Sequence, residues 1–344
     1  MLKKLSRRFR YGIVFLEILL VLLVFVLIYN FFLPLGEGKR FVYFDEKKSS
    51  KVLEALKRYG YNITDWDHLL LPESALPNKG WYRIGHHDEG RYRFFGHLGE
   101  TAAKTMNIRV YPGETHTEML HRLAHDMKLD EKRLLSVYSS LARYKEADIL
   151  AGNYTVARKA DEKTVLLYLF DRSRTKLTAF AKRNLAHHLD THAVKLLLTV
   201  ASIVQKESNN AKEMPLIASV IYNRLERGMK LQMDGTLNYG KFSHSIVTPE
   251  RIRSDTSHYN TYKYNGIPPA PLSTVSFEAL KAAIFPAESN YLFFMLNRDG
   301  SHHFSETYAE HLEHLRTFRE GRKKQTKGEN RALQKTRTES QISK

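Results

Sequence analysis

The sequence predicts an α+β protein with an N-terminal transmembrane helix, a small α/β domain, and a mostly helical α+β domain that carries a β-hairpin. Three observations support this fold class. An apolar run covers residues 11–35, and a strand-like segment followed by two helical patterns lies within residues 38–147. Helical periodicity then dominates from Thr175 onward.

The composition is that of a folded protein. Its 344 residues are enough for two modest domains, and 42% of them are apolar. The absence of cysteine excludes disulfides, thiolate metal ligands and a cysteine nucleophile. The sequence also lacks GxSxG, Walker A and GxGxxG motifs, so serine-hydrolase, nucleotide and dinucleotide functions have no support.

The net charge of +17 gathers partly at the two ends of the chain, in residues 1–10 and in a tail over residues 321–344. Such charge suits nucleic acid, anionic lipid or another polyanion. No nucleic-acid-binding motif accompanies it, so no nucleic-acid partner is predicted. The simpler interpretation of the tail is a flexible, solvated segment.

Residues 11–35 have the length and composition of a membrane-spanning helix, interrupted only by Glu17 and Asn30. The basic residues before this run outnumber those just after it, which predicts a cytoplasmic N-terminus with the rest of the chain outside. A cleavable signal peptide is the alternative. An uncleaved anchor is favoured because the run is followed by bulky residues and offers no small-x-small cleavage site.

The segment after the anchor mixes short apolar stretches with aromatic-rich turns. Alternation in RYRFFGHL, residues 91–98, predicts strands. A short strand is predicted over Ile108–Tyr111, followed by a Pro-Gly turn and a helix capped by Thr115 or Thr117. A second helix is predicted after Asp130.

This order of strand, turn, helix, loop and helix resembles the sugar-binding LysM module. The extracytoplasmic region 38–147 is therefore predicted to be LysM-like. A small α/β linker domain would show a similar pattern, so both interpretations stay open.

The second predicted domain covers residues 148–320. A helix is predicted over residues 193–208, and a second over residues 215–227, between a first-turn proline and a terminating glycine. Ser276 caps a third helix. Two strand-like runs flank an Asp-Gly turn within residues 290–305, which predicts the hairpin.

Glu207 is the carboxyl group that the helical pattern singles out. It lies at the C-terminal end of an apolar helix, on the same face as Val200, Ile203 and Val204. A carboxyl group emerging from such a stripe would be desolvated, which raises its pKa and suits a general acid. A glutamate at a frayed, solvated helix end would show the same spacing, so both interpretations stay open.

Five blocks occur in series after the anchor: ASIVQKES, IYNRLERGMKLQMDGTLNYG, HYNTYKYNGIPPAPLS, AAIFPAESNYLFFM and GSHHFSETYAEH. In order and spacing they resemble the endolytic murein transglycosylases of the YceG-like family, over about residues 195–315. This resemblance implies that residues 148–320 form a transglycosylase domain. By position, Glu207 matches the catalytic glutamate of that family.

The resemblance implies a lytic transglycosylase that cleaves the MurNAc–GlcNAc bond of nascent peptidoglycan strands. Glu207 would act first as general acid and then as base, and the product would end in 1,6-anhydro-MurNAc. The implied location is the bacterial inner (cytoplasmic) membrane, with a single pass and a periplasmic or otherwise extracytoplasmic catalytic domain. No cofactor or metal is required. The implied partners are glycan strands, the inner membrane, and peptidoglycan synthases or the division or elongation machinery.

The sequence departs from the family pattern at two informative positions. Gln205 occupies the first acidic position of the family's E-K-E motif, and Gly235 stands where the family usually has proline. The resemblance also implies that Gln232, Asp234 and Thr236 bind sugar, because they stand in one of its blocks. Tyr259, Asn260, Thr261 and Tyr262 combine aromatic faces with hydrogen-bonding groups, as sugar subsites do, and a place in the core is the alternative for the tyrosines. His303 and Ser305 are predicted to line the wall of the cleft.

Two other functions remain as alternatives. A hydrolytic muramidase would need a second carboxylate across the cleft, such as Asp234 or Asp255. A noncatalytic cell-wall scaffold would use only the anchor and the LysM-like region. The histidines show no HExxH spacing, so no metal site is predicted from them.

Overall fold

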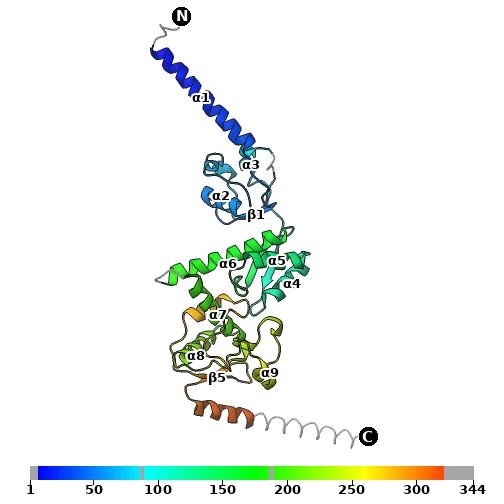
Figure 1. Ribbon diagram of the computed structural model, residues 1–344, viewed down its shortest axis with the longest axis vertical. Coiled ribbons are helices and arrows are strands. Elements are labelled where there is room, and N and C mark those ends of the chain that lie inside the picture. The colour runs from blue at the N-terminus through cyan, green and yellow to red at the C-terminus, as the bar shows by residue number, and fades with distance from the viewer. Residues whose placement is uncertain (1–6, 86–88, 186–189, 321–344) are drawn as a thin grey trace, which may run out of the picture. The chain divides into compact units, whose positions relative to one another are not determined.

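A computed structural model describes residues 7–85, 89–185 and 190–320 of the chain. The described residues combine helices with short two-stranded sheets, which confirms the α+β class (Figure 1). Some sequence features lie wholly or partly outside the described residues: the basic segment 1–10, the histidine pairs His86–His87 and His187–His188, and the tail 321–344.

The chain divides into two compact units. Unit 1 holds residues 1–109, 120–142 and 153–176, and unit 2 holds residues 110–119, 143–152 and 177–344. Each unit is a set of chain segments that pack together, and neither coincides with one continuous stretch of the sequence. The predicted domains, 38–147 and 148–320, therefore stay predictions.

The N-terminal apolar run forms one long helix, α1 (Arg7–Phe32), drawn in blue in Figure 1. Its residues Phe9–Phe32 are long and apolar enough to cross a membrane, and none of them is buried in the protein. The helix ends before the predicted limit of residue 35 because Pro34 disfavours a helical backbone at the residue before it. The apolar helix itself is confirmed.

Unit 1 contains a short antiparallel sheet and the helices that cover it. Strands β1 (Phe41–Phe44) and β2 (Gly80–Arg83) pair with Val42 opposite Tyr82. The helix α2 (Ser49–Arg58) buries its apolar face, as its amphipathic pattern requires. Two short 3-10 helices connect these elements, η1 (Asp65–Leu69) and η2 (Glu73–Ala75).

The prediction of strands over residues 91–98 is wrong, because this segment forms the helix α3 (Arg91–Gly96). Its buried residues Arg91, Phe94 and Phe95 lie three and four positions apart, on one helical face. Arg91 belongs to that face because its guanidinium pairs with Asp67 inside unit 1. The strand prediction counted Arg91 as an exposed polar residue of an alternating pattern, whereas Arg91 is buried.

The middle of the chain has the order strand, helix, helix, strand. These elements are β3 (Thr105–Val110), α4 (His116–Met127), α5 (Glu131–Leu141) and β4 (Gly152–Ala157), and β3 pairs with β4. The predicted strand and both predicted helices are confirmed, and the strand begins three residues earlier than predicted.

Caps at the two helix starts explain these boundaries. Thr115 Oγ1 accepts the N–H of Glu118 at 3.3 Å while Glu118 Oε2 accepts the N–H of Thr115 at 2.7 Å, a reciprocal capping box before α4. Asp130 accepts the N–H of Arg133 at 2.8 Å and caps α5. A long helix, α6 (Glu162–Asn184), follows β4.

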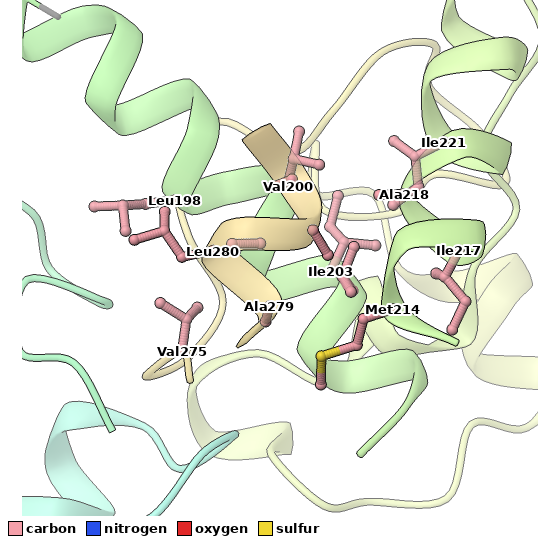
Figure 2. Close-up of a cluster of buried hydrophobic side chains, with 14 of the residues drawn as sticks. Leu198, Val200, Ile203, Met214, Ile217, Ala218, Ile221, Val275, Ala279 and Leu280 are labelled. Atoms are coloured by element: carbon pink, nitrogen blue, oxygen red, sulfur yellow. The ribbon is translucent and has the colours of Figure 1, made fainter. Parts of the chain in front are cut away.

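Unit 2 is built on three helices, α7 (Thr191–Glu207), α8 (Met214–Glu226) and α10 (Phe277–Ile284). Figure 2 shows how they pack: Ile203 on α7 lies among Ala218 and Met214 of α8 and Ala279 of α10. Short elements join these helices, namely η3 (Asp234–Leu237), η4 (Gly240–Phe242) and α9 (Pro249–Ser254).

The strands β5 (Phe293–Leu296) and β6 (His302–Ser305) pair antiparallel within unit 2. The pair is attached to the start of α8, since Nδ1 of His302 lies 2.7 Å from Oε2 of Glu213. The backbone N–H of His302 also donates to Oε1 of Glu213 at 3.1 Å. A helical segment over residues 308–320 follows the strands.

Candidate active site

Glu207 is the last residue of α7, and its backbone neighbour Ser208 is extended, so the chain leaves the helix at this point. The residues that share its face, Val200, Ile203 and Val204, are buried in the core of unit 2. The carboxyl group therefore emerges from an apolar stripe, as the sequence spacing predicts.

Among the residues that the structure describes, the carboxyl group of Glu207 has one direct hydrogen-bond donor. The backbone N–H of Gly235, in η3, donates to Oε1 at 3.0 Å. Burial raises the pKa of Glu207 to about 7, the hydrogen bond from Gly235 opposes this, and the nearby charge of Asp234 adds to it. A carboxyl group with a pKa in this range can both give and take a proton near neutral pH.

Asp234 and Tyr262 lie beside Glu207. The Tyr262 hydroxyl donates to Oδ1 of Asp234 at 2.7 Å. Burial raises the pKa of Tyr262, and its bond to Asp234 and the negative charges of Asp234 and Glu207 raise it further. Three predicted site residues, from three separate segments, therefore form one acidic cluster.

Other predicted residues form the scaffold under this cluster. Thr236 and Thr261 are buried, with their hydroxyl oxygens 2.9 Å apart. Asn260 is also buried, and its side-chain amide donates to the carbonyls of Ile252 and Asp255 at 2.8 and 2.9 Å. These hydrogen bonds join loops to one another. They are made by polar groups that were predicted to bind substrate.

Gln232 and Tyr259 keep more accessible surface. The backbone of Gln232 has a φ of 48°, and its N–H donates to the carbonyl of Thr261 at 3.2 Å. The residue itself is exposed. Tyr259 is half-buried and stacks on Tyr239, with ring centroids 4.2 Å apart and an interplanar angle of 12°. Tyr239 itself was not predicted, because no local pattern links residues twenty positions apart.

His303 and Ser305 both lie on β6. The His303 ring lies against that of His314, with centroids 3.3 Å apart, and burial lowers the pKa of His303 together with the charge of His314. Ser305 is buried and its carbonyl accepts the N–H of Leu292 at 3.0 Å. Among the described residues, no hydrogen bond or ion pair joins His303 or Ser305 to Glu207.

Lys206 and Gly235 are neighbours of Glu207 that were not among the predicted site residues. The ammonium of Lys206 donates to the carbonyl of Gly113 at 2.7 Å and to Oγ of Ser243 at 3.1 Å. Burial lowers the pKa of Lys206, and the negative charges of Glu118 and Glu146 oppose this. Its only sequence signal is a charged residue in the last turn of an otherwise apolar helix.

The arrangement offers acid and base chemistry and gives no indication of a metal centre. Within the residues that the structure describes, no group of three or more His, Asp or Glu side chains is placed to hold a metal ion. Asp255, the other carboxylate considered for hydrolysis, accepts the N–H of Ser257 at 2.8 Å and the Tyr239 hydroxyl at 3.4 Å.

Comparison with known proteins places the chain in a family. The YceG-like family matches residues 46–317. The endolytic murein transglycosylase of Bacillus subtilis is 35% identical over 119 residues, which cover 35% of this chain and 33% of that protein. The protein of that name from Streptococcus pneumoniae serotype 2 is 32% identical over 189 residues, 52% of this chain and 33% of the relative. The match thus spans about a third of the length of these curated relatives.

A solved structure of a yceG-like protein from Listeria monocytogenes covers 81% of this chain and 99% of that chain, with a TM-score of 0.49 and 22% identity. The family match, in contrast, rests on the sequence and extends over most of the chain. This chain therefore belongs to the YceG-like family.

Proposed function

We propose that this chain is a membrane-anchored endolytic lytic transglycosylase that cleaves the MurNAc–GlcNAc bond of peptidoglycan strands. One observation carries the proposal: in a chain of the YceG-like family, burial of the Glu207 carboxyl group raises its pKa to about 7. The relatives named endolytic murein transglycosylases in two organisms support the same activity.

The reaction needs only one group that alternates between acid and base. Protonated Glu207 gives its proton to the glycosidic oxygen as the bond from C1 of MurNAc to that oxygen breaks, and the electron pair leaves with the oxygen. The 6-hydroxyl of the same sugar then attacks C1, and its proton returns to Glu207. The strand is cut without water, and one new end is 1,6-anhydro-MurNAc. Glu207 ends in its starting protonation state.

A hydrolytic muramidase is the second candidate, because Asp234 is an exposed carboxylate close enough to Glu207 to raise its pKa. A second carboxylate of this kind could activate water. Tyr262 already donates to one oxygen of Asp234, which leaves the other oxygen for a further donor. The chemical identity of the product ends separates the two reactions.

The proposed location follows from α1. Its apolar side chains are exposed over Phe9–Phe32, which suits a single pass through the inner membrane. The basic residues before it favour a cytoplasmic N-terminus, and with that orientation the remaining chain meets nascent peptidoglycan outside. The strand, helix, helix, strand order over residues 105–157 supports a LysM-like module that binds the same polymer. The proposed protein partners are the peptidoglycan synthases or the division or elongation machinery.

The test is digestion of purified, uncrosslinked glycan strands by the full chain in detergent, with mass spectrometry of the product ends. We expect anhydro ends from the wild type and none from Glu207→Gln. The matched control is Glu226→Gln, because Glu226 is also the last residue of its helix but is exposed. This control should cleave like the wild type.

Each other outcome has a defined meaning. Reducing ends would replace the transglycosylase assignment with the muramidase. Undiminished cleavage by Glu207→Gln would remove Glu207 from its proposed role. If a folded wild-type chain binds glycan strands but cuts none, the noncatalytic scaffold is the better description.

A further inference from the structure

Gly235 lies against Glu207 more closely than any other residue type allows. A Cβ atom at this position would lie 2.6 Å from Oε1 of Glu207 and 2.8 Å from Cβ of Lys206. The Lys206 Cβ cannot turn away by rotating a side chain, because it is fixed to the helix backbone. The close approach brings the backbone N–H of Gly235 to 3.0 Å from Oε1.

The backbone around Gly235 is held rigidly. The N–H groups of Gln232 and Met233 donate to the carbonyl and the hydroxyl of Thr261, both at 3.2 Å. The Thr236 hydroxyl donates to the Met233 carbonyl at 2.7 Å. The loop that carries Gly235 is therefore held by three hydrogen bonds. The fold thus sets the direction in which the N–H of Gly235 donates to Glu207.

An amide N–H can only donate, and this has a consequence for the carboxyl group that it meets. In protonated Glu207 one oxygen is a carbonyl-type acceptor and the other carries the hydroxyl proton. The carbonyl-type oxygen is the better acceptor of the two, so the bond from Gly235 to Oε1 favours the form with the proton on Oε2. After ionisation the same N–H remains bonded to Oε1, and this charge-assisted bond is the stronger one.

We propose that Gly235 is a positioning residue whose backbone N–H gives the two oxygens of Glu207 different roles. The hydrogen bond from Gly235 holds Oε1 in place, and Oε2 releases and recovers the catalytic proton. This inference rests on the proposed function, since it assigns the proton of that reaction to one atom. The family usually has proline at this position, which has no N–H to donate, so the assignment is specific to this chain.

The charged and titratable groups around Glu207 are few. Asp234 faces it from η3, and Tyr262 faces it from the loop after residue 260. Lys206 precedes it, but its ammonium is bonded to Gly113 and Ser243. Gly235 is the only hydrogen-bond donor to its carboxyl group within the described part of the chain.

The decisive variant replaces the amide at Gly235 by an ester, through incorporation of glycolic acid into the full chain. The N–H is then lost and no Cβ is added. The pKa of Glu207 should rise by about one unit, since a hydrogen bond to a charged group contributes that much. The high-pH limb of the cleavage profile should move upward by the same amount. The control ester is at Gly300, whose N–H donates to the Asn297 carbonyl at 3.3 Å, away from Glu207.

A second measurement needs no change at Gly235 and no catalysis. In the wild type, the amide NMR signal of Gly235 should shift with the ionisation of Glu207, with a midpoint near the pKa of about 7. The same titration should vanish in Glu207→Gln. This readout tests the inference even if the glycan-cleaving activity proves to be wrong.

The proposal is overturned if the Gly235 signal does not follow Glu207, or if the ester leaves the pH profile and the titration midpoint unchanged. Gly235→Ala separates the donor from the close approach. It keeps the N–H but forces Oε1 aside, so we expect at least a tenfold loss of cleavage at every pH rather than a shifted profile.

Discussion

Oε1 of Gln205 accepts the backbone N–H of Ser276 at 3.0 Å, while Nε2 of the same side chain donates to Oδ1 of Asn209 at 3.0 Å. Ser276 in turn caps α10 by accepting the N–H of Ala279 at 3.1 Å. Gln205 thus ties the end of α7 to the start of α10. At the first acidic position of the family's E-K-E motif, this chain therefore has a buried amide with a structural role.

Replacing Gln205 by leucine should therefore destabilise unit 2. The change keeps the side chain's size but leaves the buried N–H of Ser276 without its acceptor, at a cost of about 1–3 kcal/mol. The matched control is Asn209→Ala, which removes only the exposed partner and should change stability by less than about 0.5 kcal/mol. Thermal unfolding of the full chain in detergent measures both. Equal stability of Gln205→Leu and wild type would contradict this role.

The pKa of Glu207 predicts how stability depends on pH. It rises from 4.5 to about 7 on folding, so between these values the folded chain binds the proton that the unfolded chain releases. The stabilising contribution is complete below pH 4.5 and is lost as pH rises through about 7. Over that window the wild type should lose about 3 kcal/mol relative to Glu207→Gln, which cannot ionise.

Melting temperatures of both proteins at several pH values test this difference. A control variant, Asp234→Asn, removes the charge that raises the pKa of Glu207. The pH dependence should then become shallower and end at a lower pH. A stability difference between wild type and Glu207→Gln that stays constant from pH 4.5 to pH 7 would refute the desolvated environment of this carboxyl group.

Tyr262→Phe should weaken catalysis without unfolding the chain. The change removes the 2.7 Å hydrogen bond to Asp234 and frees that carboxylate to move relative to Glu207. Losing one hydrogen bond to a charged group should lower kcat/KM about tenfold. Tyr264→Phe is the control, because its hydroxyl donates to the Thr256 carbonyl at 3.0 Å and not to the acidic cluster. Equal kcat/KM for both variants would show that Tyr262 does not position the site.

Local signals in the sequence predicted most of the helices. The apolar face of α7 and the caps at Asp130 and Ser276 each depend on residues three or four positions apart, so they can be recognised without a fold. The position of Glu207 beside an apolar stripe follows from the same periodicity. Of the strand pair β3 and β4, only β3 was predicted. Its partner β4 comes after two intervening helices, so no local pattern links the two strands.

The contacts that give the site its chemistry could not be predicted in this way. Gly235 meets Glu207 across 28 positions of sequence, and the stacked pair Tyr239 and Tyr259 lies in two separate blocks. Thr236 and Thr261 are polar residues of a kind that can bind sugar hydroxyl groups. Both are nevertheless buried, and their hydroxyl groups hydrogen-bond to each other. Long-range partners decide whether such a polar residue faces substrate or the core.

The ion pair between Arg91 and Asp67 gives the last prediction, for the stability of unit 1. Both side chains are fully buried, and Nη1 of Arg91 lies 2.7 and 2.6 Å from the two Asp67 oxygens. The remaining donors reach backbone carbonyls, including that of Asn62 at 2.8 Å. Arg91→Met would leave the Asp67 charge buried without its partner, which should cost about 3–5 kcal/mol.

The control for this prediction is Lys51→Ala, which breaks an exposed pair with Glu54 on α2 and should cost less than about 1 kcal/mol. The readout is urea unfolding followed by tryptophan fluorescence, because both tryptophans of the chain, Trp66 and Trp81, lie in unit 1. Adding Asp67→Leu to Arg91→Met removes the unpaired charge and should restore part of the loss. If the double variant is no more stable than Arg91→Met, the penalty comes from lost packing and not from the buried charge.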